Sequence, residues 1–356
     1  MFGGGLDQTH VDRASTPNAF RTVAFEDHRH SGASIQGHAN ISAESVGERE
    51  NGDVIGRFAP SPTGPLHVGN LRTALIAWLM ARTAGGHMIV RIEDLDRANS
   101  NEVNERRQLD ALAALGIDHP PVLVRQSERF DHYRDVIADL RTRDLVYECF
   151  CSRREIREAV NAPHEHEVQY PGTCRELTAR QRSERIDSGR PPALRLRTDT
   201  VAYVVDDVIA GATTSPVDDF VLQRNDGVPA YNLAVVVDDA EQGVDQVVRG
   251  NDLLSSTGRQ MHLQTLLGYR TPQYAHVPLV VGHDGERLAK RHGAVTLDDL
   301  ATIGIAPNDV LRELAISLGV ENHNVERAAD LLDTFRVSAL PRTPWMIPNQ
   351  WRHDAL

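Results

Sequence analysis

Two basic side chains, His67 and Lys290, are the first candidates for chemistry in this chain. His67 lies in RFAPSPTGPLHVGN, the segment from Arg57 to Asn70, and Lys290 lies in ERLAKR. Lys290 is the one lysine among 38 basic residues. All the others are arginines, whose planar guanidinium differs from the compact ammonium of lysine. A lysine kept in such a chain indicates a need for a point charge, and its pairing with His67 points to an enzyme that activates a substrate with a nucleotide.

The segment around His67 combines a strand end, a Pro-rich turn and a helix start. A turn of this kind lets backbone N–H groups and a helix N-terminus approach a phosphate. Gly64 and Gly69 remove side chains where a ligand can lie close, and His67 can donate to an oxygen that gains charge as phosphates separate. A histidine before a helix is usually structural, so the prediction rests on the whole segment.

The cysteines point to a metal site. All three of them, Cys149, Cys151 and Cys174, lie within one short stretch. Their number and spacing disfavour a disulfide framework. Zn²⁺ takes four tetrahedral ligands, so three thiolates leave one position open, and imidazole chemistry makes His164 or His166 the natural fourth ligand. The alternative is three buried thiols without a metal.

Length and composition set the broad class. A chain of 356 residues suggests two domains or one elaborated α/β domain. Charged residues at 25% and hydrophobic residues at 40% are ordinary for a globular protein. No apolar run approaches the ~20 residues that cross a bilayer, and the first residues lack an apolar signal-peptide core. We therefore expect a cytoplasmic protein without a membrane partner.

The charge balance limits how RNA can bind. A formal net charge of −12 argues against nucleic-acid binding through overall charge, but it is compatible with a local basic groove. Arginines gather in two groups. Two explanations fit these groups equally well, solvated helix faces and contact with RNA. The arginines of these groups are Arg153, Arg154, Arg157, Arg175, Arg180, Arg182 and Arg185.

The elements that must position these residues alternate between strand and helix. Ordered structure is predicted to begin at Val54, with a short strand in VIGRFAPS. Residues 71–83 form an apolar helical segment closed by Gly85, and HMIVRIEDLD has the composition of a buried strand with acids at its end. Residues 102–115 predict another helix. A strand, a helix and a strand in this order favour a right-handed βαβ unit in a parallel sheet.

Downstream, the pattern predicts a helix over residues 131–143 and a break at Tyr147, where a Cys-bearing insert begins. We expect the sheet to resume after the insert, at residues 193–197 and 201–208. The remaining predictions are a strand in FVLQR, a strand or helix in AYNLAVVVDDA, a helix over 253–267, a strand in HVPLVVG, helices within 297–332 and an irregular end in PRTPWMIPNQW.

Together the motifs resemble those of class I aminoacyl-tRNA synthetases, specifically the glutamyl group. PSPTGPLHVGN looks like the HIGH signature of that family, and ERLAKR looks like its KMSKS loop. RIEDLD and YNLAVVVDD…VVRG are also similar to glutamyl-family segments. The resemblance covers roughly residues 54–294 and keeps the motifs in the family's order.

The resemblance implies an α/β fold with a Rossmann-like, HIGH-type nucleotide-binding parallel sheet, a small zinc-bearing insert and a short helical C-terminal region. The expected parts follow one another along the chain. They are a disordered N-terminal tail at 1–52, the first half of the Rossmann catalytic domain at 53–146, the zinc-binding insert at 147–192, the second half with the KMSKS-like loop at 193–294 and the helical region at 295–356.

The length of chain after Lys290 indicates the subgroup. Only 66 residues follow it, too few for the helical anticodon-binding region of a glutamyl-tRNA synthetase. The pattern resembles glutamyl-queuosine tRNA(Asp) synthetases, which activate glutamate with ATP and transfer it to the queuosine base in the anticodon loop of tRNA(Asp). Two alternatives stay open, a truncated glutamyl-tRNA synthetase that charges the tRNA 3′ end and a catalytically silent RNA-binding paralogue.

By resemblance, the residues at ATP are His67, Gly69, Asn70 and Lys290. His67 and Lys290 stabilise charge on the phosphoryl oxygens while glutamyl-adenylate forms, and Mg²⁺ accompanies the nucleotide. The loop departs from the family pattern, because Ala289 and Arg291 stand where serines are usual. The lost hydroxyls bear on the rate of activation, whereas the cation is kept.

Glutamate needs a cation for its γ-carboxylate and an anion for its ammonium. Arg57 and Arg249 match the glutamate-binding arginines of the family, and bidentate pairing with a carboxylate suits arginine. Glu93, at the end of a predicted strand, matches the residue that holds the amino group. The resemblance completes this pocket with Phe58, Ala59, Pro60, Ser61 and Tyr231.

The family also bears on the metal. Its queuosine-specific members show a C-x-C…Y-x₃-C spacing, which Cys149, Cys151, Tyr170 and Cys174 match. We therefore expect one structural Zn²⁺ with Tyr170 as fourth ligand and keep His164 as the alternative. The expected partners are ATP, L-glutamate and tRNA(Asp) bearing queuosine, and we expect a monomer.

Overall fold

The computed structural model describes residues 53–121, 124–159, 169–199, 202–288, 295–320 and 324–351. Residues 1–52, for which we predicted a disordered tail, lie outside the described residues, and so do His164, His166 and the segment 289–294 with Lys290. All the elements below belong to one unit, Arg49–Leu356.

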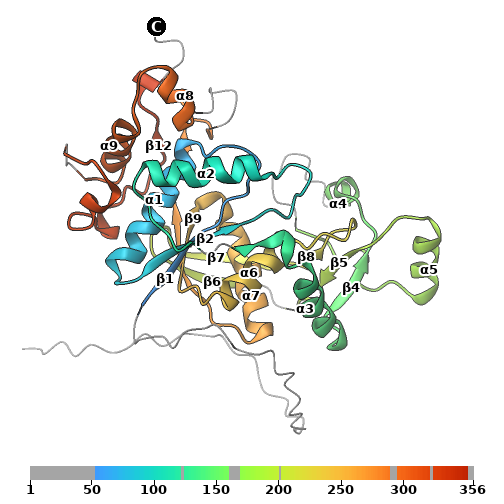
Figure 1. Ribbon diagram of the computed structural model, residues 1–356. Coiled ribbons are helices and arrows are strands. Elements are labelled where there is room, and N and C mark those ends of the chain that lie inside the picture. The colour runs from blue at the N-terminus through green and yellow to red at the C-terminus, as the bar shows by residue number, and fades with distance from the viewer. Residues whose placement is uncertain are drawn as a thin grey trace, which may run out of the picture. The chain divides into compact units, whose positions relative to one another are not determined.

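A parallel sheet forms the centre of this unit (Figure 1). Its five strands lie in the order β10-β9-β1-β2-β3, and each neighbouring pair is parallel. The predicted Rossmann-like α/β fold is therefore confirmed. The strands are β1 (Ile55–Phe58), β2 (His87–Ile92), β3 (Val124–Arg125), β9 (Gln246–Gly250) and β10 (Gln273–Val277).

Helix α1 (Val68–Thr83) makes the crossover between β1 and β2. It packs against β1, β2 and β9, and Leu71, Leu75 and Leu79 have no exposed surface. A helix that is apolar on nearly all sides is stable only when it is buried in this way. The helix was predicted to begin at residue 71. It begins three residues earlier, at Val68, because His67 caps it. The chain then turns at Gly85, whose φ of 81° suits a residue without Cβ.

The remaining helices of the catalytic part agree in place with the sequence predictions. AYNLAVVVDDA proves to be a helix. The helix predicted over 253–267 begins later than expected, at Thr257, because residues 251–256 form a separate 3₁₀ turn. The helices and turns are α2 (Glu102–Ala114), η1 (Gln126–Glu128), α3 (Phe130–Thr142), α6 (Tyr231–Glu241), η2 (Asn251–Ser256) and α7 (Thr257–Leu267).

The expectation that the parallel sheet resumes at residues 193–197 and 201–208 is wrong, because its next strand after the insert is β9. Strand β5 (Ala193–Leu196) lies between β4 (Val146–Cys149) and β8 (Val221–Gln223) in a separate antiparallel sheet. Strands β6 (Ala202–Asp207) and β7 (Gly211–Pro216) form an antiparallel hairpin of their own. Exposed residues alternate with less exposed ones along β6, which is typical of an antiparallel strand with one solvated face rather than of a buried parallel strand.

The insert is held at its base by β4 and β5. Cys149 is opposite Ala193 in this pair, so the two ends of the predicted zinc-binding insert meet in one antiparallel ladder. Two short helices lie within it, α4 (Arg153–Ala159) and α5 (Ala179–Asp187).

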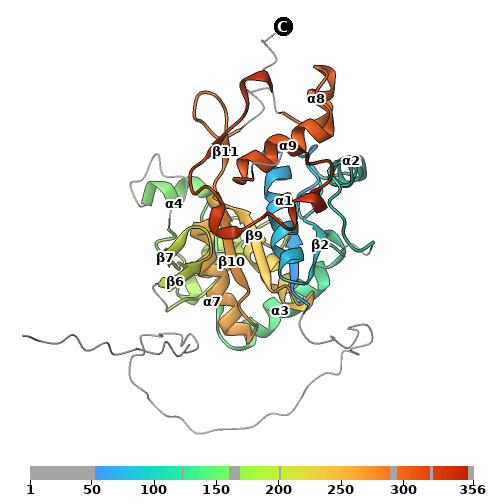
Figure 2. The ribbon, with the colours of Figure 1, turned by 90° about the vertical axis from the view of Figure 1, so that its left-hand side faces the viewer.

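The C-terminal region packs onto the start of the catalytic part. The buried Arg72 of α1 donates from Nε to Ser317 Oγ at 2.9 Å and from Nη1 to the carbonyl of Pro278 at 3.1 Å. Figure 2 shows α9 beside α1 accordingly. Two helices of this region, at 297–302 and 307–317, are each followed by a glycine with positive φ, Gly304 and Gly319. These glycines break the helical stretch predicted within 297–332. The elements are α8 (Leu297–Thr302), α9 (Pro307–Ser317), η4 (Ala328–Leu331), η5 (Val337–Ala339) and η6 (Asn349–Trp351).

Two further expectations need correction there. The segment PRTPWMIPNQW is not wholly irregular, because β12 (Trp345–Met346) pairs in parallel with β11 (Val280–Val281). HVPLVVG is not one strand, because the chain breaks at Pro278 between β10 and β11. Proline has no N–H for a ladder, so a strand tends to end there.

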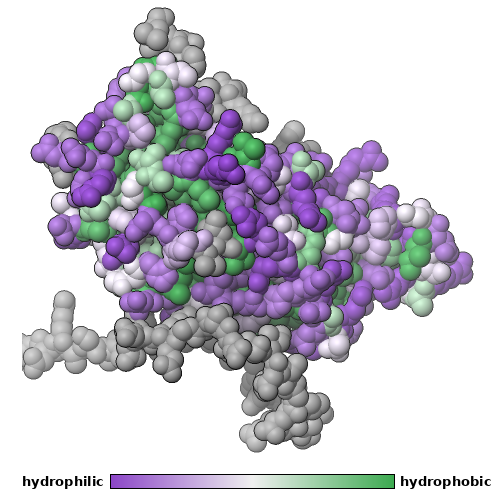
Figure 3. Space-filling view, viewed as in Figure 1, coloured by the Kyte–Doolittle hydropathy of each residue, from purple (hydrophilic) through white to green (hydrophobic). Residues whose placement is uncertain are grey.

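The surface of this unit is mainly hydrophilic on the face in Figure 3. Among the described residues, no helix combines the length and apolar character needed to cross a membrane.

Candidate active site

The imidazole of His67 caps helix α1. Its Nδ1 accepts hydrogen bonds from the backbone nitrogens of Gly69 at 3.1 Å and Asn70 at 3.3 Å. In return, Asn70 Oδ1 accepts from the backbone of His67 at 3.2 Å. A ring nitrogen that accepts carries no proton, so the neutral ring keeps its proton on Nε2. Burial, followed by the charge of Arg287, lowers the pKa of His67, so the ring is a neutral donor at pH 7.

Gly69 is needed for this cap. A Cβ at Gly69 would lie 2.8 Å from Cε1 and 2.9 Å from Nδ1 of His67, too close for two carbons or for a carbon and a nitrogen. The imidazole, rather than a ligand, therefore occupies the space that we expected Gly69 to leave. A Cβ at Gly64 would meet nothing within 4 Å, which is compatible with a ligand there.

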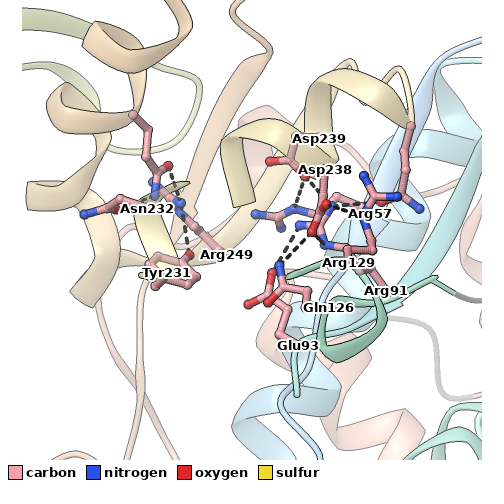
Figure 4. Close-up of polar contacts among 12 residues, drawn as sticks. Arg57, Arg91, Glu93, Gln126, Arg129, Tyr231, Asn232, Asp238, Asp239 and Arg249 are labelled. Atoms are coloured by element: carbon pink, nitrogen blue, oxygen red, sulfur yellow. Dashed lines mark hydrogen bonds and ion pairs between the residues drawn. The ribbon is translucent and has the colours of Figure 1, made fainter. Parts of the chain in front are cut away.

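Arg57 and Glu93 belong to a buried charge cluster behind the ends of β1 and β2. We use "charge cluster" for the six residues Arg57, Arg91, Glu93, Arg129, Asp238 and Asp239, which Figure 4 shows together. Arg57 is 4% exposed, donates from Nη1 to the carbonyl of Val248 at 3.0 Å and has Nε 3.6 Å from Asp239 Oδ1. Arg91 bonds Asp239 at 2.7 Å and Glu93 at 3.1 Å.

This cluster orients Glu93. Arg91 holds Glu93 Oε1, and the backbone nitrogen of Glu93 donates to the carbonyl of Pro60 at 2.9 Å. The backbone of Glu93 therefore lies next to the turn after β1, and its carboxylate is held by Arg91. Burial raises the pKa of Glu93, while Arg91 and Arg57 act in the opposite direction.

Asp238 and Asp239 are structural partners that we did not single out from the sequence. Asp238 has no exposed surface and accepts hydrogen bonds from Gln126 at 2.8 Å, Arg129 at 2.8 Å and Tyr133 at 2.8 Å. The sequence feature that could have identified them is a pair of adjacent acids at the end of an apolar helix. Acids in such a place are stable only with buried cations or donors around them.

Arg249, near the end of β9, is 4% exposed and is held by neutral groups. Its Nε donates to His276 Nε2 at 2.9 Å, its Nη1 to Gln260 Oε1 at 2.8 Å and its Nη2 to Thr257 Oγ1 at 2.9 Å. Two longer contacts, both 3.4 Å, join Nη1 to the hydroxyl of Tyr231 and Nη2 to a backbone carbonyl. Sequence reasoning did not identify His276, Gln260 or Thr257.

His67, Arg57, Glu93 and Arg249 line one cleft at the carboxyl ends of the parallel strands, where ligands bind in open α/β sheets. The cleft has a volume of about 2060 Å³. It brings together the predicted ATP and glutamate residues that the structure describes: Arg57, Phe58, Ala59, Pro60, Ser61, His67, Gly69, Asn70, Glu93, Tyr231 and Arg249.

Lys290, the remaining predicted catalytic residue, lies outside the described residues. The described residues on either side of its segment lie at the cleft or at the start of α1. Leu288 lines the cleft, and the carbonyl of Val295 accepts from the backbone nitrogen of Val68 at 2.9 Å. Thr296 forms a bridge with His67.

A second site lies in the insert. The ligand atoms of Cys149, Cys151 and Cys174 all lie within 4.8 Å of one another. The hydroxyl of Tyr170 is 3.3 Å from the sulfur of Cys149 and 3.7 Å from that of Cys151, and the sulfurs of Cys151 and Cys174 are 3.5 Å apart. Tetrahedral Zn²⁺ with Zn–S of ~2.3 Å and Zn–O of ~2.0 Å separates neighbouring ligand atoms by ~3.5–3.8 Å. These four side chains fit such an ion, and His164 lies outside the described residues.

Several arginines of the two groups considered for RNA contact have structural partners instead. Arg175 is bonded to Asp219 at 3.0 Å and Arg182 to Glu148 at 2.7 Å. Arg154 and Arg180 pair with glutamates one turn along their own helices. These contacts support the interpretation as solvated, ion-paired helix faces for Arg154, Arg180 and Arg182, whereas Arg175 lies in a turn and pairs with a buried aspartate.

Comparisons with known proteins agree with this geometry. Residues 53–347 match the family model of the catalytic domain of class I tRNA synthetases (E and Q). The chain is 51% identical over 309 residues to a glutamyl-Q tRNA(Asp) synthetase of Nocardia farcinica, covering 87% of this chain and 96% of that protein. It is 53% identical over 268 residues to the Cutibacterium acnes protein of the same name, covering 74% of this chain and 76% of that protein.

The fold also matches a solved relative. A crystal structure of a glutamate tRNA ligase from Elizabethkingia meningosepticum in complex with its amino acid superposes with a TM-score of 0.71 at 26% identity, covering 84% of this chain and 68% of that chain. From the family model and from the share of the curated relatives that it covers, the chain belongs to the class I tRNA synthetase family (E and Q), within its glutamyl-Q tRNA(Asp) synthetase group, and is an enzyme of the ligase type.

Proposed function

We propose that this enzyme activates L-glutamate with ATP and transfers it to the queuosine base in the anticodon loop of tRNA(Asp). The observation that carries the proposal is the cleft itself. It gathers a neutral imidazole donor at a helix N-terminus, a carboxylate held by the charge cluster and two buried arginines. The names of the relatives indicate the acceptor of the glutamyl group, the queuosine of tRNA(Asp).

In the first step, an oxygen of the glutamate α-carboxylate attacks the α-phosphorus of ATP, and the bond to pyrophosphate breaks. Negative charge increases on the phosphoryl oxygens, so donors fixed beforehand stabilise the transition state. His67 supplies such a donor at Nε2, at the N-terminus of α1, where the helix dipole favours negative charge. Lys290 is proposed to supply a cation at these oxygens, and Mg²⁺ accompanies the triphosphate.

Glutamate is proposed to bind by both ends. Glu93 holds the ammonium, because one of its oxygens is already fixed by Arg91 and the carboxylate faces the cleft. Arg57 and Arg249 hold the carboxylates, and Tyr231 and the turn from Phe58 to Ser61 enclose the side chain. A buried guanidinium recognises a carboxylate in two parallel hydrogen bonds.

In the second step, a nucleophilic group of queuosine attacks the activated carbonyl carbon, and AMP leaves. We also propose that the enzyme is a monomer, whose catalytic domain at 53–146 and 193–294 is interrupted by the insert at 147–192 and followed by the helical region at 295–356. The cytoplasm, where tRNA resides, is the expected compartment. The cysteine–tyrosine site in the insert is proposed to hold one structural Zn²⁺.

The test is ATP–pyrophosphate exchange with glutamate in the absence of tRNA. Glutamate-dependent exchange supports the proposal, and its absence rejects it. Radiolabelled glutamate is then offered to tRNA(Asp) with queuosine, to tRNA(Asp) without it and to tRNA(Glu). Label on the first alone supports transfer to queuosine, whereas label at the 3′ end of tRNA(Glu) identifies a glutamyl-tRNA synthetase instead.

A further inference from the structure

Arg249 differs from the arginines of the charge cluster in what surrounds it. Arg57 and Arg91 have Asp239 beside them. Among the described residues, no carboxylate lies within ion-pair distance of Arg249, although its side chain is almost wholly buried. Burying a cation without a counter-ion is unfavourable. Unlike the buried Arg72, Arg249 lines the cleft, where an anionic ligand can supply that counter-ion.

The structure explains how Arg249 is held without being neutralised. His276 of β10 accepts from Arg249 Nε through its own Nε2. On its other side, His276 Nδ1 lies 2.6 Å from Asp207 Oδ2, and neither the imidazole nor that carboxylate has exposed surface. The proton of the neutral ring is therefore on Nδ1, where it donates to the acid, and the lone pair of Nε2 faces the guanidinium.

Asp207 is itself fixed, by backbone donors. Its Oδ1 accepts from the backbone nitrogens of Ile209 at 3.0 Å, Ala210 at 2.8 Å and His276 at 3.0 Å. Oδ2 faces the ring and also lies 3.1 Å from the backbone nitrogen of His276. Because β6 carries Asp207, β10 carries His276 and β9 carries Arg249, three separate strands set this line of groups.

We propose that Asp207 and His276 are positioning residues that set the specificity of the glutamate site through Arg249. The imidazole anchors Nε of the guanidinium and separates its charge from that of Asp207, so the positive charge stays available for the side-chain carboxylate of glutamate. This inference rests on the proposed function, in which Arg249 binds glutamate.

The remaining contacts of Arg249 agree with that task. Gln260 and Thr257 hold one proton on each Nη at 2.8 and 2.9 Å. The other two Nη contacts, to Tyr231 and the carbonyl of Leu253, are long at 3.4 Å. Weak contacts of this length are the ones that a carboxylate replaces at little cost when it binds both Nη atoms.

Substitutions of His276 test the proposal through kinetics. In His276→Gln, the carboxamide still offers an acceptor to Arg249 or a donor to Asp207, whereas His276→Leu offers neither. We expect the KM for glutamate in pyrophosphate exchange to rise on the order of 100-fold in His276→Leu and less than about 10-fold in His276→Gln, because a hydrogen bond to a buried charge is lost only in the first. The KM for ATP should change by less than about 3-fold in both, since Arg249 is not proposed to touch ATP.

A near-isosteric variant covers the case in which His276→Leu does not fold. In Asp207→Asn, the three backbone donors hold the amide oxygen at the place of Oδ1, so the NH₂ group faces the ring. The ring proton then moves to Nε2, where it points at the N–H of Arg249, so the hydrogen bond between the two residues is lost. We expect the KM for glutamate to rise on the order of 100-fold here too. The matched control is His262→Gln, another buried histidine, on α7, bonded to Tyr203.

The outcomes separate this inference from the proposed function. No glutamate-dependent exchange by the unmodified enzyme rejects the function, and the inference falls with it. An active unmodified enzyme whose Asp207→Asn variant keeps its KM for glutamate overturns the inference alone. So does an equal rise in KM for glutamate and ATP, or an equal effect of His276→Leu and His276→Gln, because either marks a merely structural role.

Discussion

Asp239 and Arg91 are joined by a 2.7 Å hydrogen bond in the core behind the cleft. The same carboxylate lies 3.6 Å from Arg57, a predicted glutamate residue, and Arg91 in turn holds Glu93. One buried acid on α6 therefore helps to position Arg57, which is proposed to bind a carboxylate of glutamate, and, through Arg91, Glu93, which is proposed to bind its ammonium.

Asp239→Asn should destabilise the protein strongly. Two buried guanidiniums lose an anionic neighbour, and breaking a buried ion pair by removing one partner costs about 3–5 kcal/mol. Urea unfolding measures this loss in the free energy of unfolding. The matched control is Asp131→Asn, which removes an acid from an exposed pair with Arg134 and should cost no more than about 1 kcal/mol. Equal losses in the two variants would contradict the role of the charge cluster.

His67→Asn should separate the capping role of His67 from its proposed catalytic role. An Asn side chain can cap the N–H groups of Gly69 and Asn70, since Asn is among the best N-cap residues, but it has no donor at the place of Nε2. We expect the exchange rate at saturating substrates to fall about 10²–10³-fold, the effect of losing one transition-state donor.

His67→Ala is the comparison for that variant. It removes the cap as well, so it should lose about 1 kcal/mol of stability more than His67→Asn does, with a similar loss of rate. Thermal unfolding and pyrophosphate exchange measure the two quantities separately. A fully active His67→Asn enzyme would show that His67 is a capping residue alone.

The contiguous parts of the site could be predicted from the sequence because one turn carries them. The residues from Arg57 to Asn70 lie within a single strand–turn–helix passage, so their order along the chain is also their order around the cleft. The pairing of β1 with β2 through α1 follows from the same local pattern.

The long-range partners could not be predicted in this way. Asp207 and His276 are 69 residues apart, and Arg91 and Asp239 are 148 apart, so nothing in their local pattern links them. Strands were predicted at residues 193–197 and 201–208, but the local pattern does not specify the strands with which they pair. The assignment of β5 and β6 to the parallel sheet was wrong because strand pairing depends on distant parts of the chain.

Lys290→Ala should reduce pyrophosphate exchange by at least about 2.7 kcal/mol in activation free energy, roughly 100-fold, because it removes the proposed cation at the developing charge. Lys290→Arg keeps the charge but replaces a compact ammonium by a planar fork, so we expect it to recover only part of the rate. Steady-state exchange with saturating ATP and glutamate measures both. An unchanged rate in Lys290→Ala would remove Lys290 from the mechanism.

Tyr170→Phe should weaken zinc binding without emptying the site at once. The variant loses one proposed oxygen ligand and keeps the three thiolates, whereas Cys174→Ser loses a sulfur that lies 3.5 Å from that of Cys151. We expect purified Tyr170→Phe to release zinc to a chelator at least about 10-fold faster than the unmodified protein, because four ligands close a structural site. Cys174→Ser should release it faster still. Zinc content by atomic absorption and a colorimetric chelator give the readout, and equal release by Tyr170→Phe and the unmodified protein would favour a different fourth ligand.

Acid should destabilise the fold through its buried histidines. The pKa values of His67, His262 and His276 are all lowered, in each case mainly by burial. The unfolded chain, with ordinary histidine pKa values of about 6.5, therefore binds protons before the folded one as the pH falls. The stability that these neutral rings contribute is fully present above about pH 6.5 and is lost as the pH drops towards the lowered values.

For His67, protonation of Nδ1 also breaks the cap of α1, because that nitrogen accepts from Gly69 and Asn70. We therefore expect the free energy of unfolding to fall between about pH 7.5 and about pH 5.5, and to fall less in His67→Asn, whose cap does not titrate in this range. Urea unfolding at the two pH values measures the difference. If the two proteins lost the same stability over this interval, the neutral imidazole would not be the acid-sensitive element of the cap.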